Sequence, residues 1–84
     1  MYYVGVDIAK DKHYVCILDD AKELACKPFW IYSDILGLRE LLKRISDLSL
    51  DSDDFIIGIE STGAFSENFY SYITDADYKV ILLN

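Results

Sequence analysis

The sequence has little proline and glycine, with one proline and four glycines among its 84 residues. No apolar stretch approaches the roughly 20 residues of a membrane span, and the N-terminus lacks the basic-then-apolar pattern of a signal peptide. Hydrophobic residues make up 52% of the chain and aromatic residues 14%, which is typical of a globular protein and not of a disordered one. We therefore expect one small cytoplasmic α/β domain without a membrane partner.

Cysteine, histidine and basic residues are also scarce. Cys16 and Cys26 are ten residues apart, form no C-x-x-C pair and have only one histidine in the chain to join them, so we interpret them as buried thiols and not as metal ligands. The formal net charge is −7. An acidic domain of this size does not bind a polyanion well by charge alone, which argues against a self-sufficient nucleic-acid-binding module.

The first third of the sequence predicts three strands. Tyr2–Ile8 and His13–Leu18 are rich in β-branched and aromatic residues and are separated by a short polar stretch, which indicates an antiparallel hairpin. A third strand is predicted over Glu23–Ile31. It contains Pro28, which cannot donate a ladder hydrogen bond, so this strand is expected at the rim of the sheet.

The apolar spacing changes after Ser33, which we take as the N-cap of a helix. Helical spacing of three and four residues relates Ile35, Leu38, Leu41, Leu42, Ile45 and Leu48. The segment Ser49–Asp54 is rich in acids and is interpreted as a solvated loop without a chemical role.

The remaining segments predict a strand, a helix and a final strand. Phe55–Ile59 is almost purely apolar, as expected of a strand covered on both faces, and it is followed by Glu60. The strand Lys79–Leu83 closes the chain. The residues expected on the buried face of the intervening helix are Phe65, Phe69, Tyr72, Ile73 and Ala76.

This order of elements, β-β-β-α-β-α-β, predicts a mixed five-stranded sheet. Right-handed crossovers place strands one, four and five side by side and parallel, with strand two antiparallel and strand three at the rim, in the order 3-2-1-4-5. Asp7 and Glu60 then lie at the carboxyl ends of adjacent central strands, where open α/β sheets form their ligand crevice. The two acids are expected to share one site.

Two neighbouring carboxylates repel each other unless a cation lies between them. Mg²⁺ takes oxygen ligands, with one or two carboxylates from the protein and others from substrate phosphates. The pair therefore indicates metal-dependent phosphoryl chemistry. The alternative for each acid taken alone is a structural role as a cap of the following turn or helix.

Two sequence motifs resemble a known family. Gly5-Val6-Asp7-Ile8-Ala9-Lys10 with His13, and Gly58-Ile59-Glu60-Ser61-Thr62-Gly63-Ala64-Phe65, resemble the two N-terminal signatures of the DEDD transposases of bacterial insertion sequences, insertion-sequence family one-hundred-ten. The Piv-type invertases are relatives of this family. The resemblance covers essentially the whole chain, and two motifs at a fitting separation are more specific than either alone.

The resemblance implies an RNase H-like fold of the RuvC type and a DNA transposase or site-specific recombinase. Asp7 and Glu60 correspond to the first two acids of the DEDD tetrad, and would be ligands of Mg²⁺ or Mn²⁺. The other two acids belong to a D-x-x-D motif that the family carries beyond the last strand, and so outside residues 1–84, as is the family's C-terminal domain with its proposed serine nucleophile. The chain is thus expected to be the N-terminal part of the catalytic domain, inactive alone and holding the ions weakly.

The resemblance also implies DNA as the partner of the intact protein, together with a guide RNA and self-association. The motifs add four further positions. We interpret Lys10 as a solvated turn residue, with contact to a phosphate or the guide RNA as the alternative, and His13 as a structural hydrogen-bonding residue rather than a proton-transfer group. Thr62 and Gly63 are expected in the turn after Glu60, with Thr62 as a helix cap and Gly63 supplying a conformation or close approach that a side chain would prevent.

Two other readings remain open. Nucleotide phosphotransferases of the actin and hsp70 superfamily also begin with a strand, an acid and a hairpin, but their turn carries a glycine and a hydroxyl residue where this chain has Ile8, Ala9, Lys10 and Asp11. A non-catalytic binding module would leave Asp7 and Glu60 as turn caps. Only the transposase reading requires a D-x-x-D pair in the residues encoded after Asn84.

Overall fold

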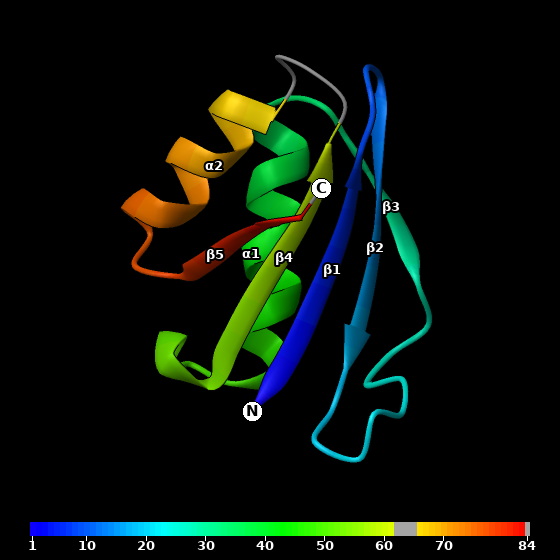
Figure 1. Cartoon of the computed structure of the whole chain (residues 1–84), viewed down its shortest axis with the longest axis vertical. Coiled ribbons are helices and arrows are strands. Elements are labelled where there is room, and N and C mark those ends of the chain that lie inside the picture. The colour runs from blue at the N-terminus through cyan, green and yellow to red at the C-terminus, as the bar shows by residue number, and fades with distance from the viewer. Residues whose placement is uncertain (62–65, 84) are drawn as a thin grey trace.

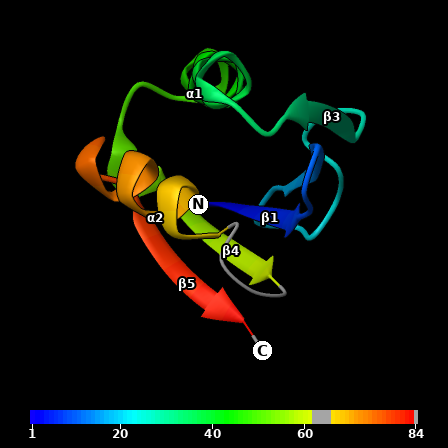
Figure 2. The same cartoon turned by 90° about the horizontal axis from the view of Figure 1, so that it is seen from above.

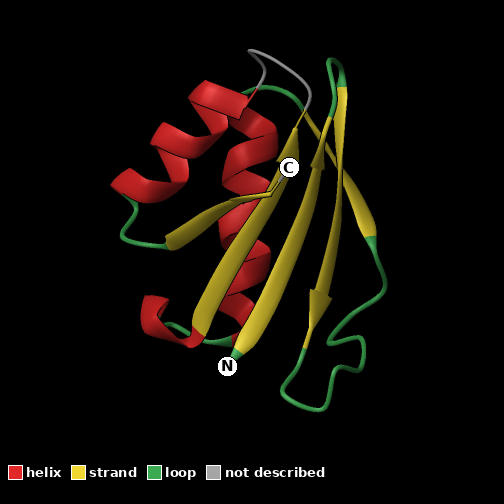
Figure 3. Ribbon diagram, in the orientation of Figure 1, coloured by secondary structure: helices red, strands yellow, loops and turns green. Residues whose placement is uncertain are grey.

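The computed structural model describes residues 1–61 and 66–83. They contain one five-stranded sheet (Figures 1 and 3). Its strands are β1 (Tyr2–Ile8), β2 (Lys12–Leu18), β3 (Phe29–Tyr32), β4 (Phe55–Ser61) and β5 (Lys79–Leu83). The order is β3-β2-β1-β4-β5, with β2 antiparallel to β1 and β3, and with β1, β4 and β5 parallel. The predicted α/β architecture is confirmed, including its strand order.

Both helices pack on the same face of this sheet (Figure 2). They are α1 (Ile35–Leu48) and α2 (Ser66–Asp75), and a short 3-10 turn, η1 (Ser52–Asp54), precedes β4. Neither helix is long and apolar enough to cross a membrane, as judged over the described residues. The crossovers from β3 to β4 and from β4 to β5 have the same hand and progress in the same direction across the sheet, so their helices form a single layer on a single face.

The core lies between the sheet and this helical layer. Along β1 the side chains alternate, with Val4, Val6 and Ile8 buried and the intervening residues exposed, as the two-residue period of a strand requires. The other buried apolar residues are Val15, Ile17, Phe29, Ile31, Leu38, Leu41, Ile45, Phe55, Ile57, Ile59, Phe69 and Ile73. Phe69 and Ile73 confirm the predicted inner face of α2.

The opposite face of the sheet, which we call the open face, corrects two predictions. Within the described residues no helix covers it, so β4 is buried on one face only, with Ile56 and Gly58 partly exposed between fully buried neighbours. Cys16 is half-buried on this face, and Cys26 is half-buried beyond β2. The apolar run of β4 and the cysteine type both favoured full burial, but the single helical layer leaves these positions uncovered.

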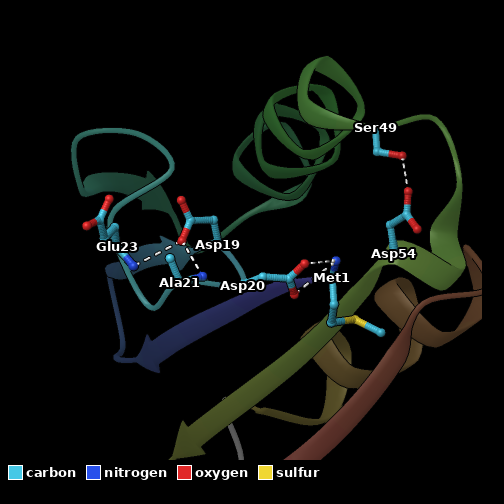
Figure 4. Close-up of polar contacts among 7 residues, drawn as sticks. All are labelled: Met1, Asp19, Asp20, Ala21, Glu23, Ser49 and Asp54. Atoms are coloured by element: carbon cyan, nitrogen blue, oxygen red, sulfur yellow. Dashed lines mark hydrogen bonds and ion pairs between the residues drawn. The ribbon is translucent and has the colours of Figure 1, made fainter.

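The third strand is shorter than predicted, because a structured turn occupies the residues before Pro28. Asp19 organises this turn: its carboxylate accepts hydrogen bonds from the amides of Ala21, at 2.9 Å, and Glu23, at 3.1 Å (Figure 4). Lys22 has a positive φ of 62°, which breaks extended backbone. Regular pairing with β2 therefore starts only at Phe29.

The acidic segment between α1 and β4 forms hydrogen bonds within itself. Asp51 caps η1 by accepting a hydrogen bond from the amide of Asp53 at 2.9 Å. Figure 4 shows the second contact, in which the Ser49 hydroxyl donates to Asp54 at 2.6 Å. The segment precedes β4 and so lies at the opposite end of that strand from Glu60. Its acids have local structural roles, although part of the predicted loop is a 3-10 turn.

The N-cap of α1 is Asp34 and not Ser33 as predicted. The Asp34 carboxylate accepts a hydrogen bond from the amide of Gly37 at 2.8 Å, whereas the amide of Ser33 donates to the carbonyl of Asp11 at 3.0 Å. Both residue types favour N-caps. Because the backbone of Ser33 is hydrogen-bonded to the β1–β2 turn, the next residue, Asp34, accepts the hydrogen bond from the first turn of the helix.

We expect Asp34→Ala to destabilise the domain by about 1 kcal/mol, because it removes the acceptor that satisfies an orphan amide of α1. Urea unfolding followed by circular dichroism measures the change. Ser33→Ala is the matched control and should change the unfolding midpoint much less. A larger loss for Ser33→Ala than for Asp34→Ala would contradict the assignment of the cap.

Candidate metal centre

Asp7 and Glu60 lie side by side on the two central strands. They are register partners in the parallel pair β1–β4, and both are exposed. Asp7 lies between the buried Val6 and Ile8, and Glu60 follows the buried Ile59, so the alternation of the strands places both side chains on the open face. Adjacent strands are about 4.8 Å apart, so the carboxylates are within reach of a single cation. The predicted proximity of the two acids is confirmed.

The acid pair belongs to a row of four residues that crosses four strands. Tyr14 of β2 pairs with Asp7, and Leu83 of β5 pairs with Glu60. All four line one shallow depression of about 210 Å³, together with Gly5, Val6, Cys16 and Gly58. The acids are thus flanked by an aromatic ring on one side and an aliphatic side chain on the other.

Two glycines give the depression its floor. Gly5 and Gly58 are register partners in the row next to the acids. A methyl group on Gly5 would meet no atom closer than the Cys16 carbonyl oxygen at 3.8 Å, whereas one on Gly58 would lie 3.2 Å from Cδ1 of Leu83. The fold therefore has room for a side chain at Gly5, and its absence leaves the sheet backbone accessible beside the carboxylates.

The donor chemistry of the pair suits a hard divalent cation. Two exposed carboxylates on one face supply oxygen ligands, which Mg²⁺ and Mn²⁺ prefer, and a cation would relieve their mutual repulsion. Among residues 1–61 and 66–83, no group of three or more His, Cys, Asp or Glu is arranged to hold a metal ion. This part of the chain thus offers an open half-site and not a closed cage.

Lys10 and His13 do not join the acids. They line a second cavity, of about 610 Å³, on the helix-covered side of the β1–β2 turn. The other residues around this cavity are Asp11, Ser33, Asp34, Ile35, Leu38, Asn68, Phe69 and Tyr72. Lys10 is exposed at its rim. The first motif therefore contributes to both sides of the sheet.

His13 is the one buried polar side chain among the described residues, with 3% of its surface exposed. Its Nδ1 accepts a hydrogen bond from the amide of Ala9 at 3.3 Å, and its ring packs edge-on against Phe69, with centroids 5.6 Å apart. Burial lowers the pKa of His13 below its usual value of 6.5, against smaller opposing effects from the Lys12 backbone and the Asp7 charge. His13 thus makes a hydrogen bond to the backbone, and its structural role in place of proton transfer stays a prediction.

Residues 62–65 of the second motif lie outside the described residues, so the roles predicted for Thr62, Gly63 and Phe65 remain predictions. Tyr14 and Leu83, by contrast, were not singled out from the sequence. Both are ordinary strand residues, and their place beside the acids depends on the register of β2 and β5. The alternation of Tyr14 with His13 and Val15 was the available signal, but it does not reveal which residue of β1 lies opposite.

A mixed sheet in this order, with acids at the carboxyl ends of two central parallel strands, defines the chain as an α/β domain of the RNase H-like class. A family model for the DEDD transposases of the IS110 type, described as a transposase, matches residues 4–84. The chain belongs to this transposase family. A search of curated proteins finds no match to it.

Proposed function

We propose that residues 1–84 are the N-terminal part of a transposase catalytic domain and contribute Asp7 and Glu60 as two of four acidic ligands for Mg²⁺ or Mn²⁺. The observation that carries the proposal is the register pairing of Asp7 with Glu60 on one open face of the sheet. Family membership supports DNA as the substrate. The D-x-x-D acids would come from residues outside this chain.

The structural alternative, in which both acids are caps, is less well supported by the contacts. The N-caps of α1 and η1 are Asp34 and Asp51, while Asp7 and Glu60 belong to regular strands and point to the open face. Carboxylates exposed on a sheet contribute little to folding. Their placement side by side is better explained by a ligand that needs both.

In this proposal the chain's own residues bind and orient the reacting phosphate. Asp7 and Glu60 would hold the metal, and a pair of such ions would supply activation of the attacking oxygen by one ion and stabilisation of the leaving oxygen by the other in an in-line phosphoryl transfer. The glycine floor at Gly5 and Gly58 allows a nucleic-acid backbone to approach the sheet closely. Tyr14 and Leu83 limit its approach from the two sides.

The full set of partners belongs to the intact protein. An acidic chain with a net charge of −7 gives little electrostatic attraction for DNA, so basic segments elsewhere would supply most of the affinity. The resemblance to the transposase family also predicts a guide RNA and self-association for the intact protein. Lys10, exposed at the tip of the β1–β2 turn, is available to a phosphate from either nucleic acid.

The test compares residues 1–84 with the protein extended through the D-x-x-D acids and the C-terminal domain, on a branched DNA substrate with Mg²⁺. We expect the extended protein to cleave and join DNA and the 84-residue chain to do neither, because two carboxylates leave most of the octahedral positions to water. Cleavage by residues 1–84 alone, at a rate similar to that of the extended protein, would contradict the proposal that two of the four acidic ligands come from outside residues 1–84.

A further inference from the structure

We propose that His13 is a positioning residue for the acid pair. Its neutral imidazole accepts a hydrogen bond from the turn after Asp7 and packs against α2, the helix that follows Glu60. This inference rests on the proposed function of the two acids. It concerns the opposite side of the sheet from the carboxylates, where His13 contacts both of the elements that continue from the acidic strand ends.

The first contact holds the end of β1. Ala9 is the first residue after β1, two positions beyond Asp7, and its amide donates to Nδ1 of His13. A second hydrogen bond holds the same turn: the amide of Ser33 donates to the carbonyl of Asp11 at 3.0 Å. The His13 bond is nearer to Asp7 along the chain, so it directly limits fraying of the strand end that carries this acid.

The second contact reaches α2. Phe69 lies in the first turns of α2 with 2% of its surface exposed, and it meets the His13 ring at an interplanar angle of 85°. Since α2 is the element that follows β4, the imidazole joins the continuation of both acidic strands. Movement of the β1–β2 turn relative to α2 would break one of the two contacts.

The hydrogen bond fixes the tautomer of the ring. A nitrogen that accepts from the Ala9 amide cannot carry a proton, so the neutral ring has its proton on Nε2. Protonation would place a second N–H against the Ala9 amide and break the bond. Burial favours the neutral form of His13, so the folded state resists protonation of the ring. Acidification below the usual pKa of 6.5 therefore weakens the hydrogen bond from the Ala9 amide to His13.

Charged and titratable groups from each neighbouring element influence this protonation. His13 projects from the covered face and Asp7 from the open face, so they are not in direct contact, yet the charge of Asp7 favours the protonated ring. Lys10 also lines the cavity beside His13. The other groups around the same cavity are Asp11 in the turn, Asp34 at the start of α1 and Tyr72 in α2.

The experiment uses nuclear magnetic resonance on isotope-labelled residues 1–84, in which His13 is the only histidine and so its ring signals need no assignment. Without metal, we expect the Nε2-protonated tautomer at about pH 7 and strong protection of the Ala9 amide against hydrogen exchange. This protection, measured relative to the intrinsic exchange rate at each pH, should fall as the ring is protonated. An Nδ1-protonated ring, or Ala9 exchange that does not respond to His13 titration, would overturn the proposal.

Two variants then separate positioning from packing. His13→Leu keeps apolar bulk but removes the acceptor, and we expect Mn²⁺ binding at the acid pair to weaken roughly tenfold, as for other groups that orient metal ligands. His13→Asn places an amide oxygen where Nδ1 lies, so it should restore the affinity and remove the part of the pH dependence that follows the imidazole. Equal affinity in wild type and His13→Leu would reject positioning.

The readouts distinguish this proposal from the proposed function. If the tautomer and the Ala9 exchange are as expected but the wild-type chain binds no Mn²⁺ at Asp7 and Glu60, the function assigned to the acids fails. If wild type binds Mn²⁺ there and both variants bind equally well, the acids keep their function and the role of His13 fails. Glu40→Gln, on the outer surface of α1, is the control and should leave both readouts unchanged.

Discussion

Replacing Asp7 by Asn is expected to abolish metal-dependent DNA strand exchange by the intact transposase while leaving the fold unchanged. An amide keeps the shape of the side chain and loses the charge that a divalent cation requires. Asp7 is exposed on the open face, so the fold does not depend on it. A bound metal contributes several kcal/mol to stabilising the transition state, so we expect a loss of at least about a thousandfold in rate.

The control for this variant is Asp53→Asn, which makes the same change of charge on an exposed residue at the far end of β4. Strand exchange is followed on a DNA substrate with Mg²⁺, and folding by circular dichroism. We expect Asp53→Asn to keep normal activity. Full activity in a folded Asp7→Asn protein would remove Asp7 from the mechanism.

The second large effect is expected on stability, from Gly37→Ala in the first turn of α1. A Cβ atom on the buried Gly37 would lie 1.8 Å from the carbonyl oxygen of Tyr32 and 2.7 Å from its carbonyl carbon. These are backbone atoms at the end of β3, so neither side can relax by turning a side chain. We expect a loss of at least about 3 kcal/mol, at the upper end of the cost of overpacking.

Gly5→Ala is the matched control for this prediction, because the same methyl group would meet no atom closer than 3.8 Å at that position. Its free energy of unfolding, measured by urea denaturation, should change by less than about 1 kcal/mol. Equal midpoints for Gly37→Ala and Gly5→Ala would contradict the close approach of α1 to β3.

The sequence predicted the sheet well because burial on one face leaves a strong periodic signal. The β-branched and aromatic composition of the strands, the helical spacing in α1 and the position of Pro28, together with the right-handed rule for crossovers, were sufficient to infer the order of the strands. The N-cap of α1 was misplaced by one residue, since Ser33 and Asp34 are both good caps and only the contact of Ser33 with Asp11 decides between them. The extent of β3 was overestimated because the turn around Asp19 depends on side-chain hydrogen bonds.

The candidate site was predictable only in part. The proximity of Asp7 and Glu60 followed from topology, because the carboxyl ends of adjacent parallel strands share an edge of the sheet. The flanking residues Tyr14 and Leu83 depend on register with β2 and β5, which periodicity does not specify. The link from His13 to Phe69 joins residues far apart in sequence, so it became visible only in the folded structure.

The most direct test of the central claim, that Asp7 and Glu60 bind one cation together, is a Mn²⁺ titration of isotope-labelled residues 1–84 followed by magnetic resonance. Bound Mn²⁺ broadens the signals of nearby amides. We predict that the amides of Asp7 and Glu60 broaden first and together, and that either Asp7→Asn or Glu60→Gln removes the effect at both strands. Broadening confined to the acidic segment around Asp51 and Asp53, or unchanged in these variants, would contradict the shared site.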